Sequence, residues 1–214
     1  MKLITEVFQD VEYIKEQNED GNKSLYIQGI FMESNKENKN GRMYKKSIVE
    51  REVSDFQQLI KEKRALGELG HPPTPSIGLN NASHLITELK MMGDDAYGKA
   101  KILSTPMGKI AESLINEGVK LGVSLRGIGT VKQVKGINEV QDDFKLSTVD
   151  IVADPSAPSA FVEGILESKE WIYENGVWKS IDLENAKNHI KNTPKSRLSE
   201  EKLAIFEKFL GSIK

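Results

Sequence analysis

A single serine in a strand-like, glycine-containing segment is the first candidate for covalent chemistry. Ser124 stands in Leu121-Gly-Val-Ser-Leu-Arg-Gly-Ile-Gly, a pattern that predicts a strand and its exit. Glycines at 122 and 127 would let a substrate backbone approach the Ser124 hydroxyl, which attacks a carbonyl carbon once a base takes its proton. A serine hydrogen-bonded within an ordinary strand gives the same pattern, so this segment alone decides nothing.

A candidate base lies in a kinked segment earlier in the chain. His71 stands in Gly67-Glu-Leu-Gly-His-Pro-Pro, where glycine and proline predict an irregular connection that can fix an imidazole. His84 lies in a strand-like run and His189 lies among lysines, so both suit this role less. A histidine in such a loop is also often a structural or surface residue, and both interpretations stay open.

A serine–histidine pair needs a third group that orients the imidazole and stabilises its protonated form. Asp150 stands among β-branched residues, on the strand face that it shares with Thr148 and Val152. Asp150 points into the site only if this strand face lines the site. The alternative is an aspartate on an edge strand with its side chain in water. Asp154 directly precedes Pro155 and is typical of a turn.

Four motifs follow one another within residues 24–162. They are Asn38-Lys-Asn-Gly-Arg-Met-Tyr, Gly67-Glu-Leu-Gly-His-Pro, Gly122-Val-Ser-Leu-Arg-Gly and Val149-Asp-Ile-Val-Ala-Asp-Pro-Ser-Ala-Pro-Ser-Ala. In order and spacing they resemble the motifs of the T-even phage prohead core protease family.

This resemblance implies a serine endopeptidase of viral procapsid maturation, with Ser124 as nucleophile, His71 as base and Asp150 as the orienting acid. Herpesvirus relatives use a second histidine as third member, and some phage relatives a glutamate two residues earlier, where this chain has Thr148. The implied oxyanion donors are backbone amides near Arg126 and Gly127. The implied fold is α+β, a β-barrel-like mixed sheet wrapped by helices, similar to the herpesvirus assembly proteases.

The resemblance also implies a specificity, because T-even-type enzymes cleave after glutamate in Leu/Ile-x-Glu. The expected substrates are procapsid scaffold and capsid proteins, cut by a homo-oligomer inside the viral procapsid, in the cytoplasm of the infected host cell. Ile4-Thr5-Glu6 fits the triplet, and chain ends are where disorder concentrates. We therefore expect a zymogen that cuts itself after Glu6, with residues 1–6 first occupying the active-site groove as a tethered inhibitor. Ile165-Leu-Glu and Leu198-Ser-Glu are further candidate triplets.

The elements that would position these residues follow from apolar spacing and turn signals. The near-helical spacing of apolar residues predicts an amphipathic helix over 45–64. Thr105 as N-cap, Pro106 at the first position and Gly118 past the end bracket a second helix. Strands are predicted over 24–32, 83–92, 96–103, 120–134 and 140–153.

The predicted organisation has three parts. Residues 1–21 are a propeptide-like segment, residues 22–167 the peptidase domain, and residues 168–214 a C-terminal appendage. In the appendage, Asn175-Gly176 predicts a hairpin turn and residues 199–210 predict a helix.

Composition limits the chemistry and the partners. The absence of cysteine excludes disulfides, thiolate zinc sites and cysteine nucleophiles, and we expect no metal or organic cofactor. A net charge of −2 offers no general attraction to phosphate backbones, so no nucleic-acid partner is expected. Glu6 and Asp10 interrupt any secretory signal, and no apolar run approaches the roughly 18 residues that cross a bilayer, so no membrane partner is expected either.

Two other classes of function stay open from the sequence. One is a non-enzymatic procapsid scaffold or assembly protein that retains the protease fold and binds partners through residues 181–213. The other is a metal-dependent hydrolase that uses Glu68, His71 and Asp150. A Glu-x-x-His ligand pair would need a helix, which Gly67, Gly70 and Pro72 disfavour.

Overall fold

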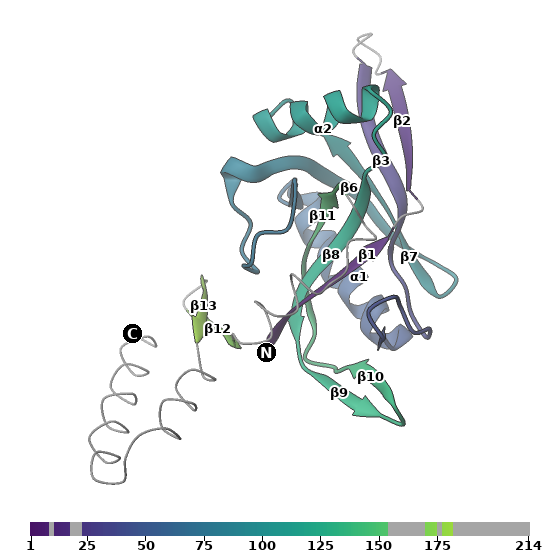
Figure 1. The fold of residues 1–214 in the computed structure, drawn as a ribbon, viewed down its shortest axis with the longest axis vertical. Helices are drawn as coiled ribbons and strands as arrows, with labels where there is room; N and C mark the ends of the chain where they lie inside the picture. Colours follow the sequence, from purple (N-terminus) through teal and green to yellow (C-terminus); the bar gives the residue numbers. More distant parts are fainter. Residues whose placement is uncertain (9–10, 18–22, 154–169, 175–176, 182–214) are drawn as a thin grey trace, which may run out of the picture.

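The computed structural model describes residues 1–8, 11–17, 23–153, 170–174 and 177–181 of the 214-residue chain. This part is a mixed α+β fold of mostly antiparallel sheets and two α-helices (Figure 1). The largest sheet has the strand order β2 (Val11–Gln17), β3 (Lys23–Met32), β7 (Asp95–Ile102), β6 (Ala82–Met92) and β5 (Leu66–Glu68).

A second sheet carries the candidate nucleophile in its middle strand. Its antiparallel order is β1 (Lys2–Phe8), β8 (Gly122–Gly129) and β11 (Lys145–Val152). Just after β5, Leu69 forms a parallel bridge with Ile151, and the amide of Gly70 donates to the Ile151 carbonyl at 2.8 Å. The end of β5 is therefore held against β11, which brings the histidine-bearing segment to the second sheet.

Two smaller pairings complete the described strands. β4 (Arg42–Met43) pairs with β10 (Ile137–Val140), which forms a hairpin with β9 (Val131–Val134). β12 (Glu170–Glu174) and β13 (Val177–Ile181) form the hairpin predicted around Asn175-Gly176.

The core lies between the sheets and α1 (Lys46–Lys61), which packs on β6 and β7. The apolar stripe that predicted this helix is its buried face and includes Ile48, Val53 and Phe56. All residues of β8 are buried, because β1 and β11 flank it and its core-facing side packs on the apolar cluster. The strand that carries Ser124 is therefore a rigid, central element.

The predicted capping of α2 (Pro106–Asn116) is confirmed. The Thr105 hydroxyl accepts from the amide of Gly108 at 3.2 Å, and Pro106 occupies the first turn. Gly118 adopts φ +82°, the left-handed conformation that favours glycine past a helix end.

Three strand boundaries differ from the prediction. Residues 120–134 split at Thr130, whose amide and hydroxyl both donate to the Asp143 carboxylate, at 2.9 and 2.5 Å. This contact turns the chain out of β8 into β9. Of residues 140–153, Val140 is the last residue of β10, and β11 begins only at Lys145. Gly67 and Glu68, predicted to begin an irregular connection, pair with β6 as part of strand β5. The predicted helix over 199–210 lies outside the described residues.

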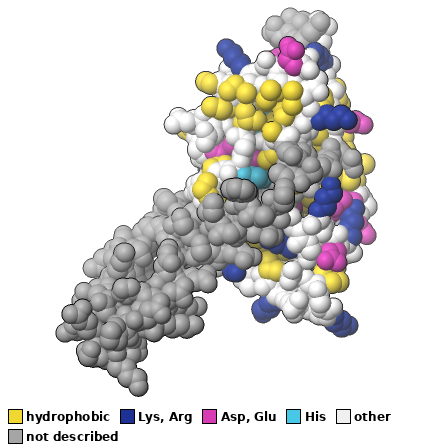
Figure 2. All heavy atoms as spheres, in the orientation of Figure 1, with side chains coloured by type: hydrophobic (Ala, Val, Ile, Leu, Met, Phe, Trp, Pro, Cys, Tyr) yellow, Lys and Arg dark blue, Asp and Glu magenta, His cyan; other side chains and the backbone are white. Residues whose placement is uncertain are grey.

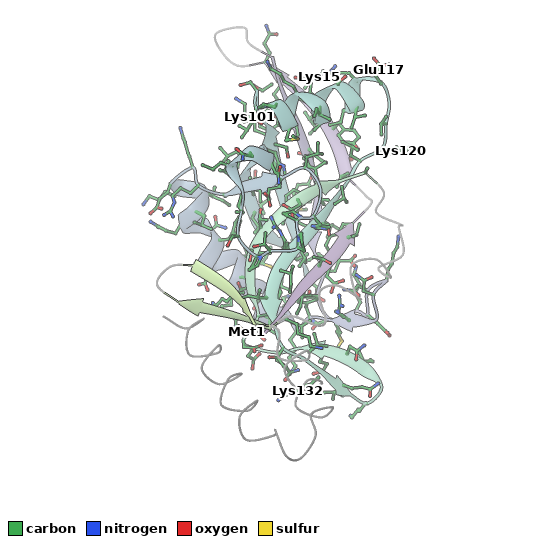
Figure 3. The ribbon with its side chains drawn as sticks, turned by 60° about the vertical axis from the view of Figure 1, so that its left-hand side comes forward. Met1, Lys15, Lys101, Glu117, Lys120 and Lys132 are labelled. Carbon is green, nitrogen blue, oxygen red and sulfur yellow. The ribbon has the colours of Figure 1, made fainter. Side chains whose placement is uncertain are left out.

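The amino-terminal residues are ordered, and the prediction of disorder around Glu6 is wrong. β1 pairs with β8 along its whole length and β2 pairs with β3 along its whole length, so residues 2–8 and 11–17 supply one strand each to the two large sheets. Figure 3 shows Met1 near the end of the molecule that carries Lys132, whereas Lys15, Glu117 and Lys120 lie at the opposite end. β1 therefore runs from one end of the domain into its centre, beside β8 (Figure 1).

The described surface has mixed charge. Figure 2 shows Lys and Arg side chains scattered among Asp and Glu on this face, without a continuous basic patch among the coloured residues. Neither described helix is long and apolar enough to cross a membrane.

Candidate active site

Ser124 and Asp150 share one face of the second sheet. They are directly opposite each other in the register of β8 and β11, and directly opposite residues of antiparallel strands point to the same side. Both are fully buried. The face predicted for Asp150 by strand alternation is therefore the face of the serine.

His71 reaches the same face from the connection after β5. Its Nδ1 lies 3.0 Å from Oδ2 of Asp150, and its side chain keeps 14% exposure. Gly70 before it adopts φ +85°, which lets the chain turn sharply after the bridge to β11. A proton on Nδ1 makes the Asp150 contact a donated hydrogen bond. Nε2 is buried with no hydrogen-bond partner among the described residues, so it is left as the free acceptor.

The Asp150 carboxylate is fixed from several sides. Its Oδ1 accepts from the backbone amide of Glu68 at 3.0 Å and from Nη2 of Arg126 at 3.2 Å. Nε of Arg126 lies 2.9 Å from Oδ2, within ion-pair distance, although its N–H does not point at that oxygen well enough for a hydrogen bond. The orientation of the acid is thus set before it meets His71.

Arg126 links two buried carboxylates and a loop. Its fully buried guanidinium also pairs with Glu68, and its Nη1 donates to the carbonyls of Thr74 and Ser76, at 2.5 and 3.3 Å. Glu68 in turn accepts from the amide of Gly78 at 2.9 Å. Charged side chains are rarely buried unless they are paired. Here one guanidinium pairs with both carboxylates, and each carboxylate also accepts from a backbone amide.

Sequence reasoning missed this role of the Arg126 side chain. The available signal was an arginine two residues after Ser124, hence on the same strand face, inside an apolar segment. The cluster also weighs against the metal-dependent alternative, because a guanidinium occupies the space between Glu68 and Asp150, the two carboxylates that it required. Among the described residues, no group of three or more His, Asp or Glu side chains could hold a metal ion.

The other candidate residues lie apart from this arrangement or outside the description. The Thr148 hydroxyl donates to the Leu66 carbonyl at 2.7 Å and so secures β11 to β5. His84 is fully buried between Ser83 and the Val149 carbonyl, and burial lowers the pKa of its imidazole. Asp154 and His189 lie outside the described residues.

The residues named for the oxyanion are inside the ladder of β8. Arg126 pairs with Thr5 on one side and Thr148 on the other, and Gly127 pairs with Ile4. A Cβ at Gly127 would lie 2.5 Å from the Phe144 ring, so glycine is needed there for close packing as well as for any approach of substrate.

β1 occupies the other edge of β8 and brings a peptide bond to the serine. Val7 is directly opposite Ser124, and the Ser124 hydroxyl donates to the backbone carbonyl of Glu6 at 2.9 Å. The Glu6–Val7 peptide bond is therefore in direct contact with the candidate nucleophile.

The Glu6 side chain is enclosed, with 1% exposure. Its carboxylate accepts hydrogen bonds from the side chains of Asn40, Arg42 and Tyr44. Burial, the largest effect, raises the pKa of Glu6, whereas the Arg42 charge lowers it; the net change is upward. The first of the four motifs thus surrounds the residue at which self-cleavage was predicted.

Comparisons with known proteins identify the family of this chain. Residues 5–170 match the sequence profile of the family described as prohead core protein serine protease. The chain is 40% identical over 144 residues to the prohead core protein protease of Enterobacteria phage T4, a match that covers 64% of this chain and 68% of that relative. The solved structure of the bacteriophage T4 capsid assembly protease, gp21, matches with a TM-score of 0.66 and 34% identity, over 71% of this chain and 97% of that one. This chain belongs to the prohead core protein serine protease family and is a serine peptidase.

Proposed function

We propose that this chain cleaves scaffold and capsid proteins after glutamate in Leu/Ile-x-Glu during viral procapsid maturation, and that it activates itself by cutting after Glu6. One observation carries the proposal. The Ser124 hydroxyl contacts the carbonyl of Glu6, while Asp150, directly opposite Ser124, contacts His71.

The proposed reaction is an acyl transfer. Oγ of Ser124 attacks the carbonyl carbon of Glu6 while Nε2 of His71 accepts the hydroxyl proton. The C–N bond then breaks, and His71 returns the proton to the departing amine of Val7. Water hydrolyses the Ser124 ester through the same histidine. The unpartnered Nε2 and the Nδ1 contact with Asp150 support these roles.

The tetrahedral intermediate needs donors for its oxyanion. We assign these to backbone amides near Arg126 and Gly127, because they belong to the strand that carries Ser124. Loss of one such donor costs about 3–4 kcal/mol of transition-state stabilisation in comparable enzymes.

The geometry of β1 supports the triplet specificity. Ile4 and Glu6 are two residues apart, so both side chains point to the same side of the extended strand, where they are 2% and 1% exposed. Thr5 between them points to the other side. An enzyme that binds alternate side chains of an extended substrate would require Leu or Ile at the first position and Glu at the third. It would accept different residues at the second position.

Strand β1 also explains how the uncut chain could be an inactive zymogen. While β1 pairs with β8, it fills the edge at which an extended substrate would pair, and its tether gives it a high effective concentration. Cutting after Glu6 removes the tether from residues 1–6, so that they can leave and open this edge.

The names of the two T4 relatives, a prohead core protein protease and a capsid assembly protease, support procapsid proteins as substrates and the procapsid inside the infected host cell as the place of action. We also propose a homo-oligomer and the barrel-like architecture of the herpesvirus assembly proteases. The continuity from β5 to β11 supports the latter, because it joins the two large sheets along one edge.

A serine-directed covalent probe with intact mass spectrometry tests the proposal. The expected result is one label per chain, located at Ser124 and absent from Ser124→Ala. Ser47→Ala, which changes an exposed serine of α1, should still be labelled. A label that persists in Ser124→Ala would remove Ser124 from the mechanism.

A further inference from the structure

The motif Asn38–Tyr44 has no role in the mechanism above, yet it surrounds the Glu6 side chain. We infer that Asn40, Arg42 and Tyr44 form the binding site for the glutamate side chain that precedes every cleaved bond. This inference rests on the proposed function, because Glu6 then stands in for the glutamate of a substrate. We call these three side chains the glutamate site.

Both carboxylate oxygens of Glu6 are bound. Oε1 accepts from the Tyr44 hydroxyl at 3.1 Å and from Nη1 of Arg42 at 3.3 Å, and Oε2 accepts from Nδ2 of Asn40 at 2.6 Å. A carboxylate with 1% exposure is costly unless such partners compensate it. Its neighbours on the same strand face, Ile4 and Phe8, belong to the apolar core cluster, so among these three side chains only that of Glu6 needs polar donors.

Two of the donors also hold the backbone. Nη1 of Arg42 and Nδ2 of Asn40 each donate to the Thr5 carbonyl, at 3.3 and 3.2 Å. The same side chains therefore bind the glutamate and the peptide group before it. This fixes the register of the strand with the Glu6 carbonyl at Ser124, since a slip of one residue would turn the glutamate to the opposite face.

The glutamate site is built by the domain and not by β1. Oδ1 of Asn38 accepts from the amides of Asn40 and Arg42, both at 3.0 Å, and Gly41 adopts φ +69° to close this turn. β10 pairs with β4, and Tyr44 packs edge-on against Phe144 with ring centroids 5.3 Å apart. The donors are thus held by contacts that do not involve residues 1–6, and remain in place for an incoming substrate.

Because its side chains donate hydrogen bonds, the glutamate site should prefer glutamate to glutamine and to aspartate. Glutamine would bring an NH₂ group toward side chains that donate, and aspartate is one methylene too short to reach them. A site that hydrogen-bonds its ligand rejects an analogue that leaves buried groups unpaired.

A double-mutant cycle on self-cleavage measures this recognition. Loss of residues 1–6 is followed by intact mass in full-length wild type, Glu6→Gln, Arg42→Met and the double variant. We expect Glu6→Gln alone to slow cleavage about 10- to 100-fold, and to change it less than about threefold once Arg42 is absent. Tyr44→Phe should have a smaller effect of the same kind, and Lys45→Met, a cation three residues from Arg42, should behave as wild type. An equal effect of Glu6→Gln with and without Arg42 would overturn the inference.

Hydrogen exchange of residues 2–8 in the Ser124→Ala background repeats the cycle without chemistry. Non-additive loss of amide protection from Glu6→Gln and Arg42→Met supports the glutamate site, and additive loss contradicts it. The two proposals fail separately. Coupling in exchange without any cleavage by wild type refutes the proposed function and supports the glutamate site, whereas cleavage without coupling in either cycle refutes the site.

Discussion

Asp150 lies directly opposite Ser124 across two hydrogen-bonded antiparallel strands, so the proposed acid and the proposed nucleophile project from one face. Only His71 has to come from elsewhere, and the bridge between Leu69 and Ile151 brings its segment to that face. The proposed catalytic geometry therefore depends on how firmly Asp150 and the end of β5 are held.

Asp150→Asn should lower kcat/KM on a Leu/Ile-x-Glu peptide by about 10³- to 10⁴-fold, as the loss of the orienting acid does in other serine peptidases. An asparagine oxygen can still accept from the Glu68 amide and from Arg126. Its NH₂ group would then face Nδ1 of His71, and a donor there cannot hold the proton on Nδ1. Asp55→Asn, which changes an exposed aspartate of α1, is the matched control. Equal losses in the two variants would remove Asp150 from the site.

Arg126→Met should lower the free energy of unfolding by about 3–5 kcal/mol, because it leaves the buried carboxylates of Glu68 and Asp150 without their cation. Adding Glu68→Gln should recover part of this loss. Arg64→Met, at an exposed ion pair with Glu62, should cost less than about 1 kcal/mol in the same urea titration. Similar costs for the two arginines would show that the buried cluster is not a structural anchor.

The local patterns predicted most of the elements and the strand face on which Asp150 lies. Thr105, Pro106 and Gly118 placed a helix correctly because capping depends on neighbouring residues. Alternation placed Asp150 on its face because a strand repeats every two residues.

The sequence could not show contacts between distant segments. Glu6 meets Asn40, Arg42 and Tyr44 across more than 30 residues, and the order of β1 depends on its pairing with β8. The end of β8 was missed for the same reason, since Thr130 turns out of the sheet to bind Asp143. The secondary-structure propensities of single residues carry no information on such contacts. From local sequence alone, a chain end is predicted to be disordered.

Gly67→Ala should destabilise the domain by about 1–3 kcal/mol or more, because the new Cβ would lie 2.1 Å from Nε2 of His84 and 2.5 Å from the Val149 carbonyl. Activity should fall with stability, since Glu68 follows directly in β5. Gly93→Ala, where nothing lies within 4 Å of the new Cβ, should lose only the cost of its φ of +68°, about 1 kcal/mol. Thermal unfolding of both variants checks this, and the reverse order would contradict the packing described for β5.

The docking of β1 should weaken as the pH rises. Burial raises the pKa of Glu6 above its ordinary value of 4.5, so the docked carboxyl binds a proton more readily than the released one. The resulting stabilisation is fully present below the ordinary pKa and is lost as pH rises through the raised, docked pKa.

Hydrogen exchange of residues 2–8 in Ser124→Ala, corrected for intrinsic rates, measures this dependence between about pH 4 and 8. Glu6→Gln in the same background should remove it. Protection that grows with pH in the presence of Glu6, or an identical profile in both proteins, would contradict the assignment.

The amino-terminal residue of the active enzyme tests the central claim, that Ser124 cuts the peptide bond it contacts in β1. Intact mass spectrometry of active wild-type protein should show a chain that begins at Val7, and Ser124→Ala should retain Met1 under the same conditions. An active enzyme that still begins at Met1 would contradict the account.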